Sequence, residues 1–246
     1  MIFERFSAIC EEERSISSEK SDWIGIYNEK RLHRILKRLV SENSSAYEIP
    51  VGRFVADVLT DGHITEIQTG RLSALLPKLK YYAEETDYTV TVIFPIVREK
   101  TILRIDTDTG EVLRKRKSGT HGTPSDILPQ LYGLREIFPC DRISYCALLV
   151  DAEEHRYSEA IRYRKAGRYD CELFPTELIE IKDISGVGDL LPLIPHFEGG
   201  ISVAEYGKLR KRKGRNLYSE LNFLVSVGLL RREREGKKYI FYKTYS

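Results

Sequence analysis

Residues 54–70 read FVADVLTDGHITEIQTG, and in this stretch two strand-like runs flank the dipeptide Asp61-Gly62. Asp-Gly between alternating apolar residues is the strongest short-range signal for a β-hairpin with a two-residue turn. We therefore expect strands over residues 54–60 and 64–69. Two acidic residues, Asp57 and Glu66, interrupt these otherwise apolar runs and require an explanation.

The length of the turn fixes which residues of a hairpin lie opposite each other. With Asp61 and Gly62 as the turn, Asp57 lies directly opposite Glu66. Opposed like charges destabilise a sheet unless a cation lies between them. A three-residue loop would instead set each acid against an apolar residue, so we prefer the two-residue turn, and the position calls for a positive charge.

The flanking sequence alternates between helical and strand periodicity. After a polar lead-in, it predicts a helix over 23–40 with Asn28 as N-cap, a helix over 71–85 in which Pro77 marks a kink or a late start, a strand over 88–97, a hairpin formed by 101–105 and 111–115, and a strand over 143–150. The order of helix, strands, helix and strand predicts an α/β (α+β) fold, with a mixed sheet and helices packed on it.

The C-terminal residues have their own pattern and charge. Residues 199–246 contain twelve Lys and Arg against four acids, a balance of +8, whereas the other 198 residues sum to −6. Helices are predicted over 201–213 and 215–227, ended by Gly214 and Gly228, and strands over 229–235 and 237–245 on either side of Gly236. Two helices followed by a basic hairpin is the layout of a winged helix. We place the domain boundary at residues 190/191, within a linker over 185–198.

Composition narrows the classes of protein. The chain of 246 residues is 41% hydrophobic and 31% charged, which is typical of a soluble globular protein, and no apolar run approaches the roughly 18 residues that a membrane helix needs. The N-terminal residues are acidic where a signal peptide would be basic. Cys10, Cys140, Cys146 and Cys171 lie far apart without zinc-ligand spacing, as expected for thiols in a reducing compartment. We expect a cytoplasmic protein.

The acids on the hairpin suit a divalent metal. Glu66 and Gln68 lie on one side of their strand, because side chains alternate, and Asp57 faces them from the neighbouring strand. Mg²⁺ prefers one or two carboxylates together with waters and phosphate oxygens, as does Mn²⁺ in such sites, and this chemistry serves phosphodiester hydrolysis. The alternative is that both acids decorate an exposed hairpin.

Over residues 27–97 this arrangement resembles the PD-(D/E)XK nuclease superfamily, which includes restriction endonucleases. The resemblance implies a restriction-endonuclease-like core over residues 1–190, with Asp57 and Glu66 as the two metal-binding acids. It places Gln68 at the lysine position of the family and Glu29 at the extra acid that some branches carry on the first helix. Glu29 also fits an exposed position in the first turn of a helix, where the helix dipole favours an acid.

Gln68 departs from the motif, because glutamine cannot bring a positive charge to the attacking water or the transition state. Some members of the family tolerate glutamine here, and in others a nearby helix supplies the cation, a role open to Lys78 or Lys80. The remaining alternative is an inactive relic that binds DNA.

Three groups of residues are candidates for nucleic-acid contact. They are Arg114, Lys115, Arg116 and Lys117 at a strand end, Arg215, Asn216, Tyr218 and Ser219 at the start of the second C-terminal helix, and Arg232, Arg234, Lys237 and Lys238 in the C-terminal hairpin. The first group also fits a solvated turn, and the C-terminal groups fit a protein-docking module.

Two functions follow from these patterns. The first is a Mg²⁺- or Mn²⁺-dependent DNA endonuclease recruited to DNA by a winged helix. The second is a non-catalytic DNA-binding regulator with an inactive nuclease-like scaffold. The sequence does not distinguish DNA from RNA as the target, and it leaves open whether two chains pair as a homodimer to cut both strands. It gives no reason to expect a membrane partner.

Overall fold

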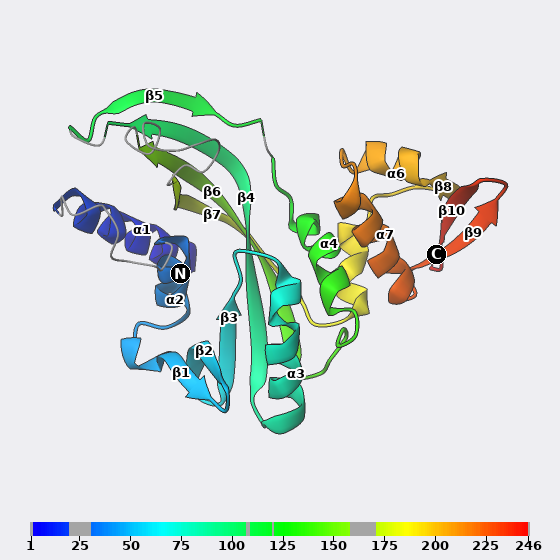
Figure 1. Ribbon diagram of the computed structural model, residues 1–246, viewed down its shortest axis with the longest axis horizontal. Coiled ribbons are helices and arrows are strands. Elements are labelled where there is room, and N and C mark those ends of the chain that lie inside the picture. The colour runs from blue at the N-terminus through cyan, green and yellow to red at the C-terminus, as the bar shows by residue number, and fades with distance from the viewer. Residues whose placement is uncertain (1, 20–30, 107–108, 120, 158–170, 246) are drawn as a thin grey trace. The chain divides into compact units, whose positions relative to one another are not determined.

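The computed structural model describes residues 2–19, 31–106, 109–119, 121–157 and 171–245 (Figure 1). The chain divides into two compact units. Unit 1 comprises residues 1–60, 95–123 and 148–181, and unit 2 comprises residues 61–94, 124–147 and 182–246. No helix in the described ranges combines the length and the apolar character that crossing a membrane would require.

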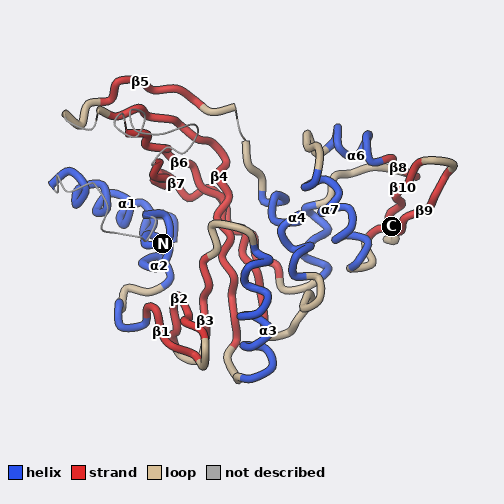
Figure 2. The backbone as a smooth tube through the Cα atoms, in the orientation of Figure 1, coloured by secondary structure: helices blue, strands red, loops and turns tan. Residues whose placement is uncertain are grey.

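Helices and strands follow one another in short groups along the chain (Figure 2). The helices are α1 (Ile2–Glu19), α2 (Arg31–Val40), α3 (Leu76–Glu85), α4 (Leu128–Leu131), α6 (Val203–Leu209) and α7 (Arg215–Ser226). The strands are β1 (Tyr47–Val51), β2 (Phe54–Thr60), β3 (His63–Ile67), β4 (Thr89–Ile105), β5 (Val112–Lys117), β6 (Ile143–Tyr157), β7 (Cys171–Ile184), β8 (Gly200–Ser202), β9 (Leu230–Glu235) and β10 (Lys238–Lys243). Short 3-10 segments include η2 (Leu72–Leu75) and η5 (Val187–Leu193).

The larger sheet is mixed, as predicted. Its strand order is β1-β2-β3-β4-β6-β7, and β5 also pairs with β4. β1 runs antiparallel to β2, whereas β3 runs parallel to β4, with Glu66 opposite Val92. Parallel strands need a crossover connection, and α3 lies in the one between β3 and β4. The prediction of a mixed α/β fold with a helix-flanked sheet is therefore confirmed.

The turn between β2 and β3 consists of Asp61 and Gly62, as predicted from the Asp-Gly signal. Both residues have positive φ angles, 48° and 79°. Positive φ at both central positions is the property of a type I′ turn, whose twist matches that of the flanking strands. The opposition of Asp57 and Glu66 stays a prediction from this turn.

Helix α3 begins at Leu76 and carries Pro77 in its first turn, so the predicted late start is confirmed. Proline is tolerated there because its missing N–H would have no helical partner. The helix is anchored by Leu79 and Tyr82, both fully buried. Lys78 precedes Tyr82 by four residues and therefore lies on the same side of the helix.

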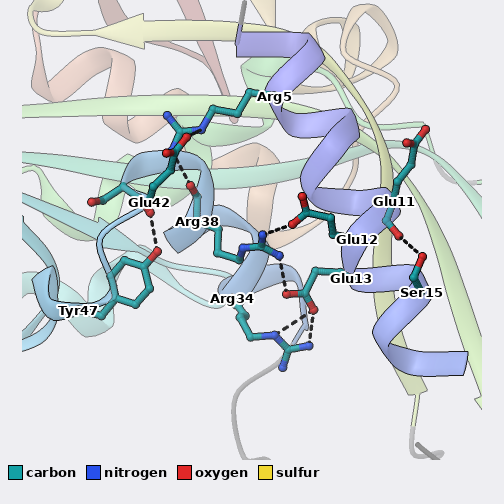
Figure 3. Close-up of polar contacts among 10 residues, drawn as sticks. Arg5, Glu11, Glu12, Glu13, Ser15, Arg34, Arg38, Glu42 and Tyr47 are labelled. Carbon is teal, nitrogen blue, oxygen red and sulfur yellow. Dashed lines mark hydrogen bonds and ion pairs between the residues drawn. The ribbon is translucent and has the colours of Figure 1, made fainter. Parts of the chain in front are cut away.

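Residues 2–19, the polar lead-in of the sequence, form α1, a helix that was not predicted. Helix α1 packs on α2 through the buried carboxylate of Glu13, which accepts hydrogen bonds from Arg34 at 2.6 Å and Arg38 at 3.1 Å (Figure 3). Burial alone would raise the pKa of Glu13, but the hydrogen bonds and charges of these two arginines hold that pKa below its usual value. Ion pairs thus fix the position of α2, which carries part of the candidate site.

Strand β4 is continuous over 17 residues, so the predicted strand over 101–105 is its distal part rather than a separate strand. β5 pairs antiparallel with this distal part, as the predicted hairpin requires. The chain returns to β4 at Gly122, whose N–H donates to the Arg98 carbonyl at 3.0 Å. A Cβ atom at residue 122 would lie 2.3 Å from the Val97 oxygen, so only glycine fits without a shift of the backbone.

The C-terminal residues form a small sheet and two helices. The sheet has the order β8-β10-β9. The predicted helix over 201–213 begins only at Val203, because Gly200–Ser202 form β8 and Ser202 caps α6 through a capping box with Glu205. Helix α7 and the stop at Gly228, whose φ is 77°, agree with the prediction.

Within unit 2, α7 packs against α4 (Figure 1), and the Phe138 and Phe223 rings meet edge to face with centroids 5.3 Å apart. Residues 185–198 are more than the predicted linker, because η5 buries Leu190 and Leu193. The boundary predicted at residues 190/191 stays a prediction.

Candidate functional site

Glu66 lies on β3, where the strand is buried on both faces, and its side chain is only 1% exposed. Lys78 Nζ donates to Glu66 Oε2 at 2.5 Å, and the Tyr82 hydroxyl donates to Glu66 Oε1 at 3.3 Å. Both partners come from the same side of α3. A buried carboxylate is costly unless it is paired and hydrogen-bonded, so α3 supplies what keeps this acid in the interior.

The two lysines proposed for the missing cation, Lys78 and Lys80, have different partners. Lys78 contacts Glu66, whereas Lys80 points to the surface and pairs with Glu136 at 2.7 Å. The difference follows from helix phase, because Lys78 lies one helical turn before Tyr82 and Lys80 does not. Lys78 is therefore the cation that the structure brings to Glu66.

Asp57 lies on β2 and is paired with His33 of α2, at 3.2 Å between Nε2 and Oδ2. Both side chains are about one-fifth exposed, Asp57 at 20% and His33 at 22%. The sequence interpretation missed His33. The only signal available was its place in the helix predicted over residues 23–40.

Gln68 follows the end of β3 and continues the ladder to β4, since its N–H donates to the Ile93 carbonyl at 2.9 Å. Its side-chain amide donates to the Arg71 carbonyl at 2.9 Å, which ties the strand end to the start of η2. Glu29 and the predicted cap Asn28 lie outside the described residues.

A metal would be bound through carboxylates here. Among the described residues, no group of three or more His, Cys, Asp or Glu is arranged to hold one. An ionised carboxylate has about four lone-pair directions, so the contacts of Glu66 with Lys78 and Tyr82 are compatible with a further ligand. Oxygen ligands are those that Mg²⁺ and Mn²⁺ prefer, so the carboxylate chemistry of Glu66, taken alone, suits a hard cation.

The predicted nucleic-acid contacts are at the surface. The whole of β5 is exposed, including Arg114, Lys115, Arg116 and Lys117. At the start of α7, Arg215, Asn216 and Tyr218 are exposed and Ser219 is half-buried. In the C-terminal hairpin, Arg232, Arg234, Lys237 and Lys238 are exposed.

Two of the C-terminal cations serve the interior instead. Glu220 is fully buried and accepts hydrogen bonds from Arg210 at 2.6 Å, Arg212 at 2.8 Å and the Tyr206 hydroxyl at 2.9 Å. Arg212 also pairs with Asp126, so this cluster ties α6 and α7 to the preceding part of unit 2. Burial and the Glu220 charge raise the pKa of Tyr206, which keeps its hydroxyl a donor.

The two faces of the β9–β10 hairpin differ in charge. Residues opposed in an antiparallel pair share a face, which puts Arg231 with Tyr242 and Arg232 with Phe241. Arg231 is neutralised by Glu233 on its own face. Arg232 donates to Asn222 of α7 at 3.4 Å, so its face is the one toward that helix.

On this face, Arg232 and Arg234 have no carboxylate partner in the part of the chain that the structure describes, and the Tyr239 ring lies 4.7 Å from the Arg232 guanidinium. The face toward α7 is therefore cationic and aromatic, and the opposite face is largely self-neutralised.

A family model described as "Domain of unknown function (DUF8091)" matches residues 30–185, which is more than half of the chain. The matched residues include Asp57, Glu66 and Lys78, and they end before β8, α6 and α7. No curated protein and no solved structure matches the chain.

Proposed function

The chain belongs to the family described as a domain of unknown function (DUF8091), and we propose that it is a metal-dependent DNA endonuclease that hydrolyses phosphodiester bonds. The observation that carries this proposal is the order of elements around the acids. Helix α2, strands β1, β2 and β3, helix α3 and a β4 parallel to β3 follow one another as in the restriction-endonuclease-like core, with Asp57 on β2 and Glu66 on β3.

In this proposal Asp57 and Glu66 bind Mg²⁺ or Mn²⁺, which would polarise the phosphodiester and activate a water. Lys78 holds the carboxylate of Glu66 and supplies the positive charge that Gln68 cannot. His33 orients Asp57 through its hydrogen bond. The Gln68 side chain, which holds the Arg71 carbonyl, maintains the path of the chain after β3.

The test is cleavage of plasmid, linear, branched and single-stranded DNA in Mg²⁺, Mn²⁺ or chelator. We expect metal-dependent cutting by the native chain and a loss of about 10²- to 10³-fold in Asp57→Asn and in Glu66→Gln. Glu136→Gln is the matched control, because it also removes a lysine-paired carboxylate, but one at the surface. Thermal melting checks that each variant is folded, and Asp57, being less buried than Glu66, gives the safer variant.

Absence of cutting in every metal, or cutting that survives in folded Asp57→Asn, would overturn the nuclease proposal. In that case the second function, a non-catalytic DNA-binding regulator, is favoured by the exposed cations of the C-terminal residues. The regulator would then be expected to bind DNA as tightly in chelator as in the presence of metal.

For the C-terminal residues, we propose a winged helix. Its support is the order β8, α6, α7, β9, β10 and the sheet order β8-β10-β9, in which the last strand lies between the other two. Helix α7 would enter the major groove, and the β9–β10 hairpin would be the wing that touches phosphate. In this arrangement the cationic face of the hairpin, on the side of α7, meets the nucleic acid.

The two faces of the hairpin give a matched pair of variants. We expect Arg232→Ala to weaken DNA binding for all sequences and to reduce the slope of log K against log salt by about 0.9, the value for one lost phosphate contact. Arg231→Ala should leave that slope unchanged, because Arg231 is already paired with Glu233. Fluorescence anisotropy titrations in chelator measure both. Equal effects of the two substitutions would contradict the assignment of faces.

A further inference from the structure

The distal part of β4 and the strand β5 form an antiparallel pair within unit 1, in which β5 is added to the larger sheet through β4 alone (Figure 1). The register sets Ile102 opposite Arg116, Leu103 opposite Lys115 and Arg104 opposite Arg114. Every residue of β5 is exposed, and Arg104 on β4 is exposed as well. We call residues 101–105 and 112–117 the basic ribbon.

The feature that needs an explanation is the direct opposition of Arg104 and Arg114. Residues opposed in an antiparallel pair have Cβ atoms about 4.5–5.5 Å apart, and like charges there are destabilising. Neither arginine has a carboxylate partner among the described residues. The repulsion is thus left uncompensated within the described chain.

Other cations of β4 are paired with acids of β6. Arg98 of β4 forms a two-pronged pair with Asp151 of β6, at 2.9 and 2.5 Å, and Lys100 pairs with Glu154 of the same strand. Hydrogen bonding to Asp151 raises the pKa of Arg98. Proximal cations of β4 therefore have acids placed beside them, whereas the distal Arg104 faces a second arginine.

Protection of a sheet edge explains only part of this pattern. Lysine and arginine on an edge strand discourage pairing with other chains, and this accounts for the charges on β5. It gives no reason for a cation on β4 directly opposite one of them. Among the described residues, the acids closest in sequence to the ribbon are Glu99, which pairs with Lys117 at 3.6 Å, and Asp106 and Glu111 at the far end of the ribbon.

We propose that the basic ribbon binds the phosphate backbone of a nucleic acid, with Arg104, Arg114 and Arg116 as the contacting cations. A phosphate between Arg104 and Arg114 would turn their repulsion into a shared charge-assisted contact. Arg116 lies on the same face as Arg114, two residues along the strand. The contact reads no sequence, since it involves no base edge. The choice of nucleic acid as the polyanion rests on the proposed function.

The test is binding of the full chain to duplex DNA in chelator, measured by fluorescence anisotropy over a series of salt concentrations. The double variant Arg104→Gln/Arg114→Gln should reduce the slope of log K against log salt by about 0.9, for the one phosphate that the two arginines share. The control Lys80→Gln/Arg135→Gln removes the same charge from the surface of unit 2 and should change the slope little.

Thermal melting supplies a second readout. The substitutions that weaken DNA binding should leave the stability of the free protein unchanged or raise it. Because the opposed arginines repel each other, Arg104→Gln/Arg114→Gln should melt at the native temperature or higher in low salt. Added duplex DNA should raise the melting temperature of the native chain more than that of the variant. This combination of results is expected of a binding surface that destabilises the free protein. Removing a pair with a purely structural role would instead lower the stability of the protein.

An unchanged slope in a folded double variant would overturn the proposal, as would failure of the native chain to bind duplex DNA, single-stranded DNA and RNA. Binding to anionic lipid vesicles in place of nucleic acid would also overturn it. The chelator separates this test from that of the proposed function. A reduced slope in the double variant without any metal-dependent cutting would refute only the nuclease proposal. Cutting with an unchanged slope would refute only the proposal that the basic ribbon binds nucleic acid.

Discussion

The substitution Glu220→Gln is expected to lower the free energy of unfolding by about 3–5 kcal/mol, the range for removing one partner of a buried ion pair. Glu220 is fully buried, and Arg210 and Arg212, at 10% and 14% side-chain exposure, both depend on it. A neutral amide would leave two largely buried guanidinium groups without their shared counter-charge. We expect α6 and α7 to separate from the segment around Asp126 before the rest of unit 2 unfolds.

Urea denaturation followed by far-UV circular dichroism measures this loss. The control is Glu233→Gln, which removes an arginine-paired carboxylate from the exposed hairpin and should change stability little. If Glu220→Gln were as stable as this control, the cluster could not be what joins α6 and α7. Replacing Glu220, Arg210 and Arg212 together by apolar residues should restore much of the stability, since no buried charge then remains.

The second large effect is expected for Lys78→Met. The substitution leaves Glu66, which is 1% exposed, without its cation and should also cost about 3–5 kcal/mol. If the proposed function holds, the cutting rate should fall as well, because the same lysine supplies the positive charge beside Glu66. Methionine keeps most of the length of the side chain, so lost packing contributes little.

Lys80→Met is the matched control, since it removes a lysine from the same helix two residues away. Lys80 pairs with Glu136 at the surface and should be replaceable without measurable loss of stability or cutting. Combining Lys78→Met with Glu66→Gln removes the unpaired charge and should restore stability but not cutting. Equal melting temperatures for Lys78→Met and Lys80→Met would show that the Glu66 contact is not what stabilises β3.

Local chemistry explains which parts of the fold could be predicted. The Asp61-Gly62 turn, the late start of α3 at Pro77 and the end of α7 at Gly228 each depend on residues adjacent in the chain. Helix α1 escaped prediction because its buried stripe is short, with Phe6, Ile9 and Cys10, and continues into the charged residue Glu13. Strand β7 was missed because it contains Pro175 and five charged residues, which weaken the strand signal.

The candidate site, like the fold, was predictable only where residues close in the chain determine it. The acids could be identified because they interrupt apolar strands, and a nearby cation was expected on grounds of charge. The choice of Lys78 over Lys80 depends on the phase of α3, which is fixed by the burial of Tyr82. The charge of +8 over residues 199–246 overstates what the surface presents, since Arg210 and Arg212 point to Glu220.

Gly122 has a consequence for the comparison of relatives. It lies in the matched family region, and its close approach to the Val97 oxygen holds the returning end of the basic ribbon against β4. A relative with a larger residue here must route this segment differently. In an alignment of the family, glycine at this position should therefore co-occur with basic residues at positions 104 and 114, and its replacement should mark the branches that have lost the ribbon.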